Sequence, residues 1–324
     1  MNAKIQNIYG ESIFRSLISG KSLDSFAKDC YYRLYKDEKI DWRKLLYAAS
    51  LCFCHVVEAN GDGQSKSPRC IIFDDTMIQK SNSGCEGCTK VHDHVAHKAV
   101  YGMKVLTCAY FDGTTTVTDF SIHRELGKNG KGGLSDVEWK YQYSKKRSEN
   151  SPGSQRFSEI DTSKIDQVSE MIRRGVRHGL TIKYALFDSW FTCPKLISKI
   201  REIGKQNIHV VALHKMDNQR FTVNGKLRHI QDLVALNERN AKPCRKMKAV
   251  YFTLRGEMGG IPVKMFFVRY GKQDKWRMVY RLIKLLSDIT GLGVNEIMEM
   301  ILQDEEKDKI YAKLCNFIKK QQVA

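Results

Sequence analysis

The succession of apolar segments in the middle of the chain leaves few folds open to it. Residues 70–75 (CIIFDD) predict a short buried strand, and 100–111 and 114–123 predict two more strands. Asp112 and Gly113 separate these two, and Asp-Gly between alternating runs is a strong hairpin signal. Helix, strand, helix and strand patterns follow. This order predicts an α/β protein with a mixed sheet flanked by helices.

Two helices and two strands complete this central region. Ser163 and Asp166 form a capping-box pattern at the start of a helix with one apolar face. Pro194 suits the first turn of a second helix. Strands are expected at 182–188 (IKYALFD) and 208–213 (IHVVAL), one after each of these helices. Both strands can therefore join the same sheet.

The chain carries a large positive charge, with 54 lysines and arginines, 36 acidic residues and a net charge of +18. This favours a polyanionic partner such as nucleic acid, although a generally basic surface would give the same total. Many basic residues gather in a polar stretch from 124 to about 160, which is too long for an ordinary connector and therefore expected to be functional or disordered. Tyr141 and Tyr143 lie among them, as at nucleic-acid surfaces. The residues expected to contact DNA are Lys128, Lys131, Lys140, Lys145, Lys146, Arg147, Arg245, Lys246 and Lys248.

Four regions follow from these patterns. Residues 1–65 have apolar positions at three- and four-residue spacing, which predicts a helical region and a candidate for DNA binding. The α/β core is assigned to 66–213. Residues 214–279 return to short strands and turns, which indicates a β-rich insertion. Residues 280–324 are expected to form a helical tail.

No segment of the sequence predicts secretion or a membrane. The longest apolar tract, 45–57, is too short and too interrupted to span a bilayer, and the N-terminus lacks the apolar core of a signal peptide. The ten cysteines show no regular disulfide framework, which indicates reduced thiols. We therefore expect a cytoplasmic protein without a membrane partner.

Two of the predicted strands run directly into aspartate. Asp74 and Asp75 follow one apolar run, and Asp188 follows another. Taken alone, the pair could form a solvated turn and Asp188 could cap the next helix. However, ligands gather outside the carboxyl ends of parallel strands. The two strand ends could therefore meet and hold Mg²⁺ or Mn²⁺ on a phosphodiester.

A second candidate metal site lies in the loop CEGCTKVHDH. Cys85, Cys88, His92 and His94 are ligand types of a tetrahedral zinc site, but the histidine spacing is tighter than in a standard finger. The alternative is a Gly-containing loop with incidental thiols. Zinc is the weaker of these two interpretations.

Several separated motifs occur in a characteristic order. They are FDDT (73–76), HDHVAHKAVYGMKVLTCAYFDG (92–113), FSIHRELGK (120–128), the YSKKR run, LFDSWFTC (186–193) and IPVKMFFVRYGK (261–272). Together these motifs resemble the bacterial insertion-sequence DDE transposases, which have a ribonuclease-H-like core. The resemblance extends from about residue 10 to residue 279.

The resemblance implies roles for single residues. Asp74 matches the first catalytic aspartate of the family and Asp188, in DSWF, matches the second, whereas Asp75 is only a neighbour. Both matched residues would be ligands of Mg²⁺ or Mn²⁺. Relatives keep the His-rich end of the Cys/His loop without both cysteines, which disfavours zinc and leaves His94 and His97 to serve the core or the DNA.

The resemblance also implies a cellular setting. Members of the family bind double-stranded DNA at the terminal repeats of their element and at the target, in the bacterial cytoplasm and its nucleoid. They usually act as dimers, so a homodimer is a further expectation, although no feature of the sequence marks a dimer face. The stretch 214–279 resembles the insertion that many relatives carry between the second aspartate and the catalytic glutamate.

The chain departs from the family at this glutamate. Relatives carry it in the pattern Y-x-x-R-x-x-x-E-x-x-x-x-x-x-K after the insertion, and no stretch after Val279 has this pattern. A block is missing between Met278 and Leu282. Glu296 and Glu299 are the nearest candidates, and both fall on the polar side of a predicted helix. We expect these two to lie too far from the aspartates to share a metal.

Three hypotheses remain. The first is a DDE transposase, intact or decayed, built for metal-dependent strand cleavage and transfer. The second is a non-catalytic, truncated transposase that only binds DNA or associates with the full-length enzyme. The third and weakest is a zinc-stabilised DNA-binding protein.

Overall fold

The computed structural model describes most of the chain between Arg33 and Tyr280. Contacts along the backbone divide these residues into two units, and each is considered by itself. The smaller unit is drawn from 33–42 and 144–158, and the larger from 43–143 and 159–280. The described ranges are 33–34, 36–60, 68–93, 96–204, 207–244, 248–271 and 274–280.

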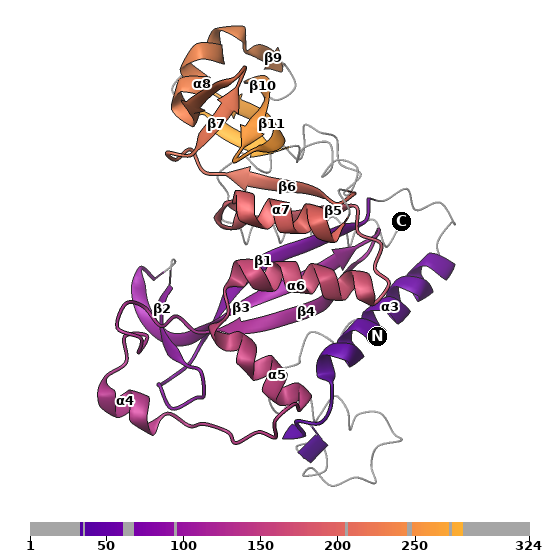
Figure 1. The fold of residues 1–324 in the computed structure, drawn as a ribbon, viewed down its shortest axis with the longest axis vertical. Coiled ribbons are helices and arrows are strands. Elements are labelled where there is room, and N and C mark those ends of the chain that lie inside the picture. Colours follow the sequence, from indigo (N-terminus) through magenta and orange to yellow (C-terminus); the bar gives the residue numbers. More distant parts are fainter. Residues whose placement is uncertain are drawn as a thin grey trace. The chain divides into compact units, whose positions relative to one another are not determined.

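A mixed, mostly antiparallel sheet forms the larger unit (Figure 1). Its described strands are β1 (Cys70–Gln79), β2 (Thr89–Asp93), β3 (Lys98–Phe111), β4 (Thr115–His123), β5 (Tyr184–Phe187), β6 (His209–His214), β7 (Arg220–Val223), β8 (Lys226–His229), β9 (Lys242–Cys244), β10 (Ala249–Met258), β11 (Ile261–Arg269) and β12 (Arg277–Tyr280). They are ordered β2-β3-β1-β5-β6-β12-β11-β10-β7-β8, with β4 beside β3 and β9 beside β10. The predicted mixed α/β architecture is confirmed.

The described helices are short, apart from three that cover the sheet. They are α3 (Trp42–Asn60), α4 (Asp136–Tyr141), α5 (Pro152–Ser158), α6 (Lys164–Arg177), α7 (Pro194–Ile203) and α8 (Ile230–Asn237), with 3-10 turns η1 (Glu159–Asp161), η2 (Ser189–Phe191) and η3 (Glu238–Asn240). Within the described ranges, no helix combines the length and the apolar character needed to cross a membrane.

The two predicted core helices begin where the sequence indicated, but the predicted capping box is wrong. Ser163 is the N-cap residue of α6, yet its side chain makes no capping hydrogen bond. Asp166 turns instead to α7, where the Nζ atom of Lys199 lies 2.7 Å from Asp166 Oδ1. Pro194 is the first residue of α7, as predicted.

β1 joins the antiparallel and parallel parts of the sheet. It pairs antiparallel with β3 along its whole length, from Cys70 opposite Phe111 to Gln79 opposite Gly102. It also pairs in parallel with β5, which pairs in parallel with β6. The predicted hairpin is confirmed as β3 and β4, and Gly113 in its turn has φ 120°, a conformation that favours glycine.

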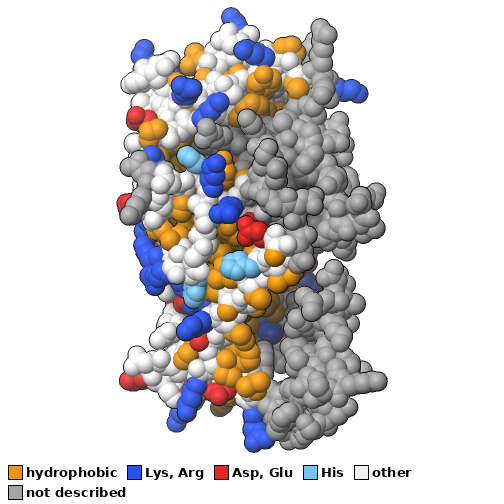
Figure 2. All heavy atoms as spheres, turned by 90° about the vertical axis from the view of Figure 1, so that its right-hand side faces the viewer, with side chains coloured by type: hydrophobic (Ala, Val, Ile, Leu, Met, Phe, Trp, Pro, Cys, Tyr) orange, Lys and Arg blue, Asp and Glu red, His pale blue; other side chains and the backbone are white. Residues whose placement is uncertain are grey.

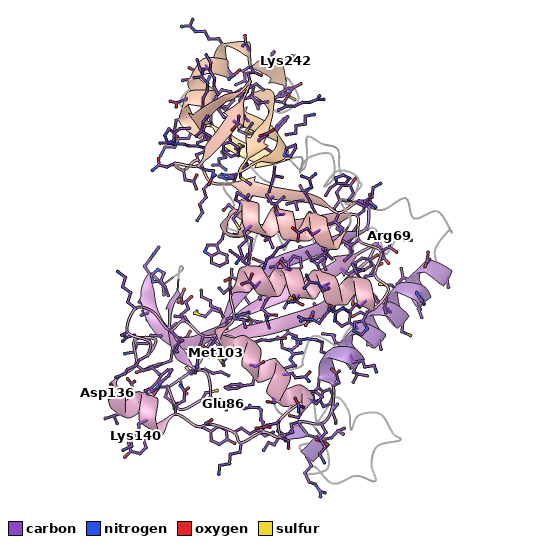
Figure 3. The ribbon with its side chains drawn as sticks, in the orientation of Figure 1. Arg69, Glu86, Met103, Asp136, Lys140 and Lys242 are labelled. Carbon is purple, nitrogen blue, oxygen red and sulfur yellow. The ribbon has the colours of Figure 1, made fainter. Side chains whose placement is uncertain are left out.

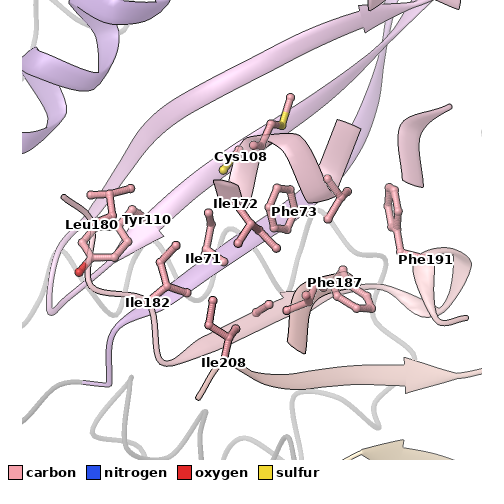
Figure 4. Packing of buried hydrophobic residues seen from close by; sticks show 14 of the residues in the cluster. Ile71, Phe73, Cys108, Tyr110, Ile172, Leu180, Ile182, Phe187, Phe191 and Ile208 are labelled. Atoms are coloured by element: carbon pink, nitrogen blue, oxygen red, sulfur yellow. The ribbon is translucent and has the colours of Figure 1, made fainter. Parts of the chain in front are cut away.

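One face of this sheet is covered by α3, α6 and α7. Tyr47, Ile172 and Leu196, one from each helix, are buried in the same cluster as Ile71 and Phe73 of β1. Figure 4 shows Ile172 beside the side chains of Ile71 and Phe73. Burying one large apolar side chain contributes about 1.5–3 kcal/mol, so this layer fixes the helices on the sheet.

The opposite face of the same strands carries a second buried cluster. Cys70, Phe111, Leu186 and Val211 contact one another there. Side chains alternate between the two faces of a strand. In β1, Cys70 lies in this second cluster and the next residue, Ile71, lies in the helix-covered cluster. Both faces of the central strands are therefore buried, which explains their nearly continuous apolar sequence.

A buried group of charges ties α3 and α6 to β4. The fully buried Asp119 accepts hydrogen bonds from Arg43 at 2.9 Å and from Arg174 at 2.8 Å. Arg43 also donates to both carboxylate oxygens of Glu159, at 2.8 and 2.6 Å. The Tyr47 hydroxyl donates to Asp119 at 3.2 Å, and burial raises the pKa of this tyrosine. These charges are tolerated inside the protein because each has a partner.

The segment from β7 to β11 forms a second packed region, joined to the core by β12. β12 pairs with β11 on one side, and Met278 pairs with His214 of β6 on the other. Phe221, Met265 and Phe267 are buried together with Ile197 of α7. The core and the insertion therefore share one sheet and an apolar contact surface that includes α7.

Two features of the fold differ from the sequence prediction. The first strand does not end at Asp75, because pairing with β3 continues it to Gln79. The polar stretch after residue 124 is not an irregular loop, since it contains α4 and α5. At α4, Ser135 and Glu138 form a capping box with both reciprocal hydrogen bonds.

The smaller unit is held together by polar contacts. Glu38 accepts hydrogen bonds from the Ser148 backbone N–H at 3.0 Å and from its hydroxyl at 2.8 Å. These bonds lower the pKa of the Glu38 carboxyl. The Arg147 guanidinium lies 4.3 Å from the centre of the Phe157 ring in α5.

Candidate functional site

Asp74 and Asp75 lie inside β1, so the hypothesis of a solvated turn is wrong. Asp74 pairs with Thr107 and Asp75 with Leu106 on β3. Successive side chains of a strand point to opposite faces. Phe73 belongs to the helix-covered cluster, so Asp75 lies on that face and Asp74 on the other. The two adjacent carboxylates therefore cannot act as one paired site.

Asp188 directly follows β5 and begins η2. Its backbone is extended, with φ −74° and ψ 177°, and its side chain accepts the backbone N–H of Trp190 at 2.8 Å. Asp188 thus caps this short 3-10 turn, whereas the N-cap residue of α7 is Cys193. A carboxylate offers about four acceptor positions, so capping is compatible with binding a cation.

The structure brings Asp74 and Asp188 to neighbouring positions on adjacent parallel strands. Phe73 and Phe187 form the last pair between β1 and β5, and the next residue on each strand is aspartate. Figure 4 shows these two phenylalanines on neighbouring strands. Adjacent strands lie about 4.8 Å apart. Leu186 belongs to the face opposite the helices, so alternation puts Asp188 on the same face as Asp74.

Asp75 is engaged by Lys164 on the helix-covered face. The Lys164 Nζ atom lies 2.7 Å from Asp75 Oδ2 and 5.1 Å from the centre of the Trp190 ring. Lys164 is mostly buried, while Trp190 is half-exposed. This lysine therefore contacts the residue after Asp74 and the second residue after Asp188. No sequence motif singles out Lys164, because only the folded sheet brings it here.

His123 of β4 lies near the same lysine. Burial lowers the pKa of His123, and the positive charge of Lys164 lowers this pKa further. The His123 Nδ1 atom is 3.1 Å from the Thr162 carbonyl oxygen, which can only accept, so Nδ1 carries the hydrogen. Nε2, 2.7 Å from Ser121 Oγ, then accepts from that hydroxyl. The neutral ring thus satisfies both of its nitrogens inside the protein.

The chemistry of the two aspartates suits a hard divalent cation. Mg²⁺ and Mn²⁺ prefer oxygen ligands, and Mg²⁺ sites commonly use one or two carboxylates with water and substrate phosphate. Across the described ranges, no group of three or more His, Cys, Asp and Glu side chains is arranged to hold a metal. Glu296 and Glu299 lie outside the described residues. Their expected distance from Asp74 and Asp188 therefore stays a prediction.

The predicted DNA-contacting residues of the larger unit lie at its surface. Lys128, Lys140 and Lys248 are exposed. Figure 3 shows Lys140 on α4, together with Asp136. Lys131 forms an ion pair with Asp136, so part of its charge is compensated within the protein.

The remaining predicted basic residues belong to the smaller unit or lie outside the described part. Lys145 donates to the backbone oxygen of Lys36 at 2.9 Å, and Arg147 lies against Phe157. Lys146 is exposed. Two of these three side chains therefore also have structural contacts. The residues outside the described ranges are Arg245 and Lys246.

Three of the four residues of the zinc group considered from the sequence, Cys85, Cys88 and His92, lie in the described ranges. Cys85 is exposed, whereas Cys88 is fully buried and its thiol donates to the Asn82 carbonyl oxygen at 3.5 Å. Burial raises the pKa of the Cys88 thiol, which opposes the thiolate that zinc requires. His92 is exposed on β2, and His94 lies outside the described residues. Among the residues described, Cys85, Cys88 and His92 are not gathered as metal ligands.

Neither a known protein family nor a curated protein matches the sequence. The observations that bear on the function are therefore the geometry of the site and the sequence motifs.

Proposed function

We propose that this chain is a DDE-type transposase of a bacterial insertion sequence, which binds DNA at the ends of its element. One observation carries the proposal: Asp74 and Asp188 follow the last paired residues of two adjacent parallel strands, on the same sheet face. Two carboxylates from separate segments are what a metal-dependent phosphodiester chemistry requires. The family motifs quoted above point to the same two residues.

The strand order is compatible with a ribonuclease-H-like core. β1, β5 and β6 run parallel to one another. On the other side of β1, β3 pairs antiparallel with β1, and β4 pairs antiparallel with β3. Helices α3, α6 and α7 cover one face. Because a fold alone does not determine function, this similarity supports the proposal only together with the aspartates.

In this proposal, Asp74 and Asp188 hold Mg²⁺ or Mn²⁺, which when bound stabilises the negative charge that develops on a phosphodiester during strand cleavage and transfer. The remaining residues orient the two ligands. The Trp190 N–H fixes one oxygen of Asp188. Strand alternation puts Asp75 on the other face, where Lys164 pairs with it, so β1 presents a single carboxylate to the site.

The surface charge suits a DNA partner. Figure 2 shows lysine and arginine side chains at many separate places on the face it draws, with fewer acidic ones among them. A chain with net charge +18 neutralises phosphates and releases counterions, so binding should weaken as salt rises. The proposed partner is therefore double-stranded DNA, at the element ends and at the target.

A second candidate function is DNA binding without catalysis. The missing glutamate pattern after Val279 favours it, since the loss of one metal-site carboxylate weakens the stabilisation of the transition state. Such a protein would occupy element ends or associate with a full-length transposase.

The test uses end-labelled duplexes that tile the DNA flanking the gene. Wild-type protein is expected to bind one set of duplexes in a salt-sensitive manner and to cut them with Mg²⁺ or Mn²⁺. Asp74→Asn and Asp188→Asn should bind equally well but not cut, with Asp75→Asn as the neighbouring control that still cuts.

The outcomes separate the two candidates. Specific binding without cutting at any protein or metal concentration would reject the enzyme and support the DNA-binding protein. Absence of salt-sensitive DNA binding would reject both.

A further inference from the structure

A cavity lies between the core and the insertion, and Thr192, whose hydroxyl donates to the Asp188 backbone oxygen at 3.2 Å, is one of its lining residues. Its volume is about 480 Å³, and residues of α7, β6, β10 and β11 line it. The turn between β10 and β11 packs on the start of α7, since a Cβ atom on Gly259 would lie 3.0 Å from Pro194 Cγ. Ile197 of α7 is also buried in the core of the insertion. The cavity is thus bounded by parts that are packed together.

The lining of this cavity combines an apolar surface with positive charge. Ile197, Val210 and Ile261 contribute apolar surface, and Arg201, Arg255 and Lys264 contribute positive charge. None of the described residues that line the cavity is acidic. A ligand with an apolar part and an anionic part would match this lining.

Two of the basic residues are placed unfavourably for stability. Arg255 of β10 and Lys264 of β11 are direct cross-strand partners, so their side chains share one face of the sheet. Like charges directly opposite each other destabilise a strand pair. Over the described ranges, neither residue forms an ion pair with a carboxylate. An anion between them would remove the repulsion.

The ordinary interpretation is a solvated strand face with incidental basic residues, and three observations oppose it. Both side chains of the opposed pair are exposed, but they lie at the rim of a cavity that other elements also line. Arg201 adds a third positive charge from α7, an element distant in sequence. Glu257, the nearest carboxylate on β10, pairs with Pro262 and is not a lining residue. The arrangement therefore concentrates positive charge at one place.

We infer that this cavity, which we call the α7–β11 cavity, binds phosphate groups of the DNA backbone. Arginine presents a planar fork that matches phosphate oxygens, and lysine supplies a compact charge. The apolar residues suit the deoxyribose that links successive phosphates. A volume of about 480 Å³ lies within the range of sites for small ligands, so it accommodates a nucleotide unit. The inference rests on the proposed function and adds a DNA contact outside the metal site.

The test measures DNA affinity by fluorescence anisotropy over a range of NaCl concentrations. The test variant is Arg255→Gln/Lys264→Gln. The matched control is Arg228→Gln/Lys242→Gln, which also removes one arginine and one lysine from the insertion but not from the cavity lining. Figure 3 shows Lys242 on the insertion. Circular dichroism and thermal unfolding first establish that both variants fold.

Each phosphate contact contributes about 0.9 to the slope of log K against log[NaCl] for duplex DNA. In the test variant, the magnitude of this negative slope is expected to decrease by about 0.9 to 1.8. The slope of the control should stay within error of wild type. Adding Arg201→Gln to the test variant should decrease the magnitude further. Equal slopes for wild type and the test variant, or equal losses in test and control, would overturn the inference.

A second measurement identifies the source of the phosphate. The melting temperature of the wild-type protein is measured with and without inorganic phosphate, in sulfate-free buffer of constant ionic strength. Millimolar phosphate is expected to leave the melting temperature unchanged. Stabilisation lost in the test variant would assign the cavity to a free phosphate compound and overturn the assignment to DNA. If the proposed function itself is wrong, the result is different: the wild-type protein shows no salt-sensitive DNA binding.

Discussion

The Lys164 ammonium and the Asp75 carboxylate form an ion pair of 2.7 Å on the helix-covered face of β1. Strand alternation puts the two adjacent carboxylates on opposite faces, and this contact holds the Asp75 carboxylate on its own face. Asp75 is tied to the start of α6, while Asp74 lies on the other face beside Asp188. The two adjacent aspartates of the sequence therefore lie on opposite faces of the sheet.

The first prediction concerns which carboxylates bind metal. Asp74→Asn and Asp188→Asn should each weaken Mn²⁺ binding by at least about tenfold, because even losing a hydrogen-bond partner behind a ligand costs about 10- to 100-fold. Asp75→Asn should leave binding nearly unchanged. Electron paramagnetic resonance of free Mn²⁺ measures this without requiring catalysis. Equal weakening in all three variants would show that Asp75 is a ligand.

The second prediction concerns the buried charges around Asp119. Asp119→Asn leaves Arg43 and Arg174 buried without full compensation, so the free energy of unfolding should fall by about 3–5 kcal/mol. The control is Asp161→Asn, which breaks the more exposed pair with Arg124 and should cost less than about 1 kcal/mol. Urea unfolding measures both. Similar losses in the two variants would mean that the buried group contributes no special stability.

The third prediction concerns pH. The pKa of His123 is lowered in the folded protein, so the unfolded chain binds its proton more readily. The stabilisation by neutral His123 is therefore complete above the unfolded pKa of about 6.5 and decreases as pH falls toward the folded pKa. The free energy of unfolding should decrease from pH 7 to pH 5, and less so in His123→Gln. Urea titrations at both pH values measure the difference; a steeper decrease in the variant would contradict it.

The fourth prediction concerns the two thiols of the Cys/His loop. Cys85 is exposed and Cys88 is buried with a raised pKa, so iodoacetamide should label Cys85 rapidly and Cys88 only after unfolding. Mass spectrometry of peptides identifies the labelled residue. Protection of both thiols that is lost with a chelator would instead support a zinc site.

The strands and helices of the core were predictable because their signals are local. The Asp-Gly hairpin, the proline at the start of α7 and the apolar runs of β1, β5 and β6 each depend on a few consecutive residues. The end of β1 was not predictable in this way. β1 continues beyond Asp75 because β3, which follows it in the chain, supplies hydrogen bonds as far as Gln79.

The candidate site was predictable in part. Asp74 and Asp188 could be named because both directly follow apolar strand residues and match family motifs. Lys164 could not, since its contact with Asp75 joins residues that are 89 positions apart. The opposition of Arg255 and Lys264 depends on the register of β10 and β11, which the sequence does not fix by itself. Ser163 shows the reverse case, a pattern whose predicted hydrogen bond is absent at α6.

The position of β12 has a consequence for how the protein is made. β12 is the last described strand, yet it lies between β6 and β11 and connects the two halves of the sheet. During synthesis, the ribosome must therefore release residues 277–280 before that connection can form. Until then, the backbone N–H and C=O groups of β6 and β11 that pair with β12 have no partner strand. Unpaired strand edges of this kind can pair with other chains. Nascent chains stalled before residue 277 should consequently be prone to aggregation and depend on chaperones.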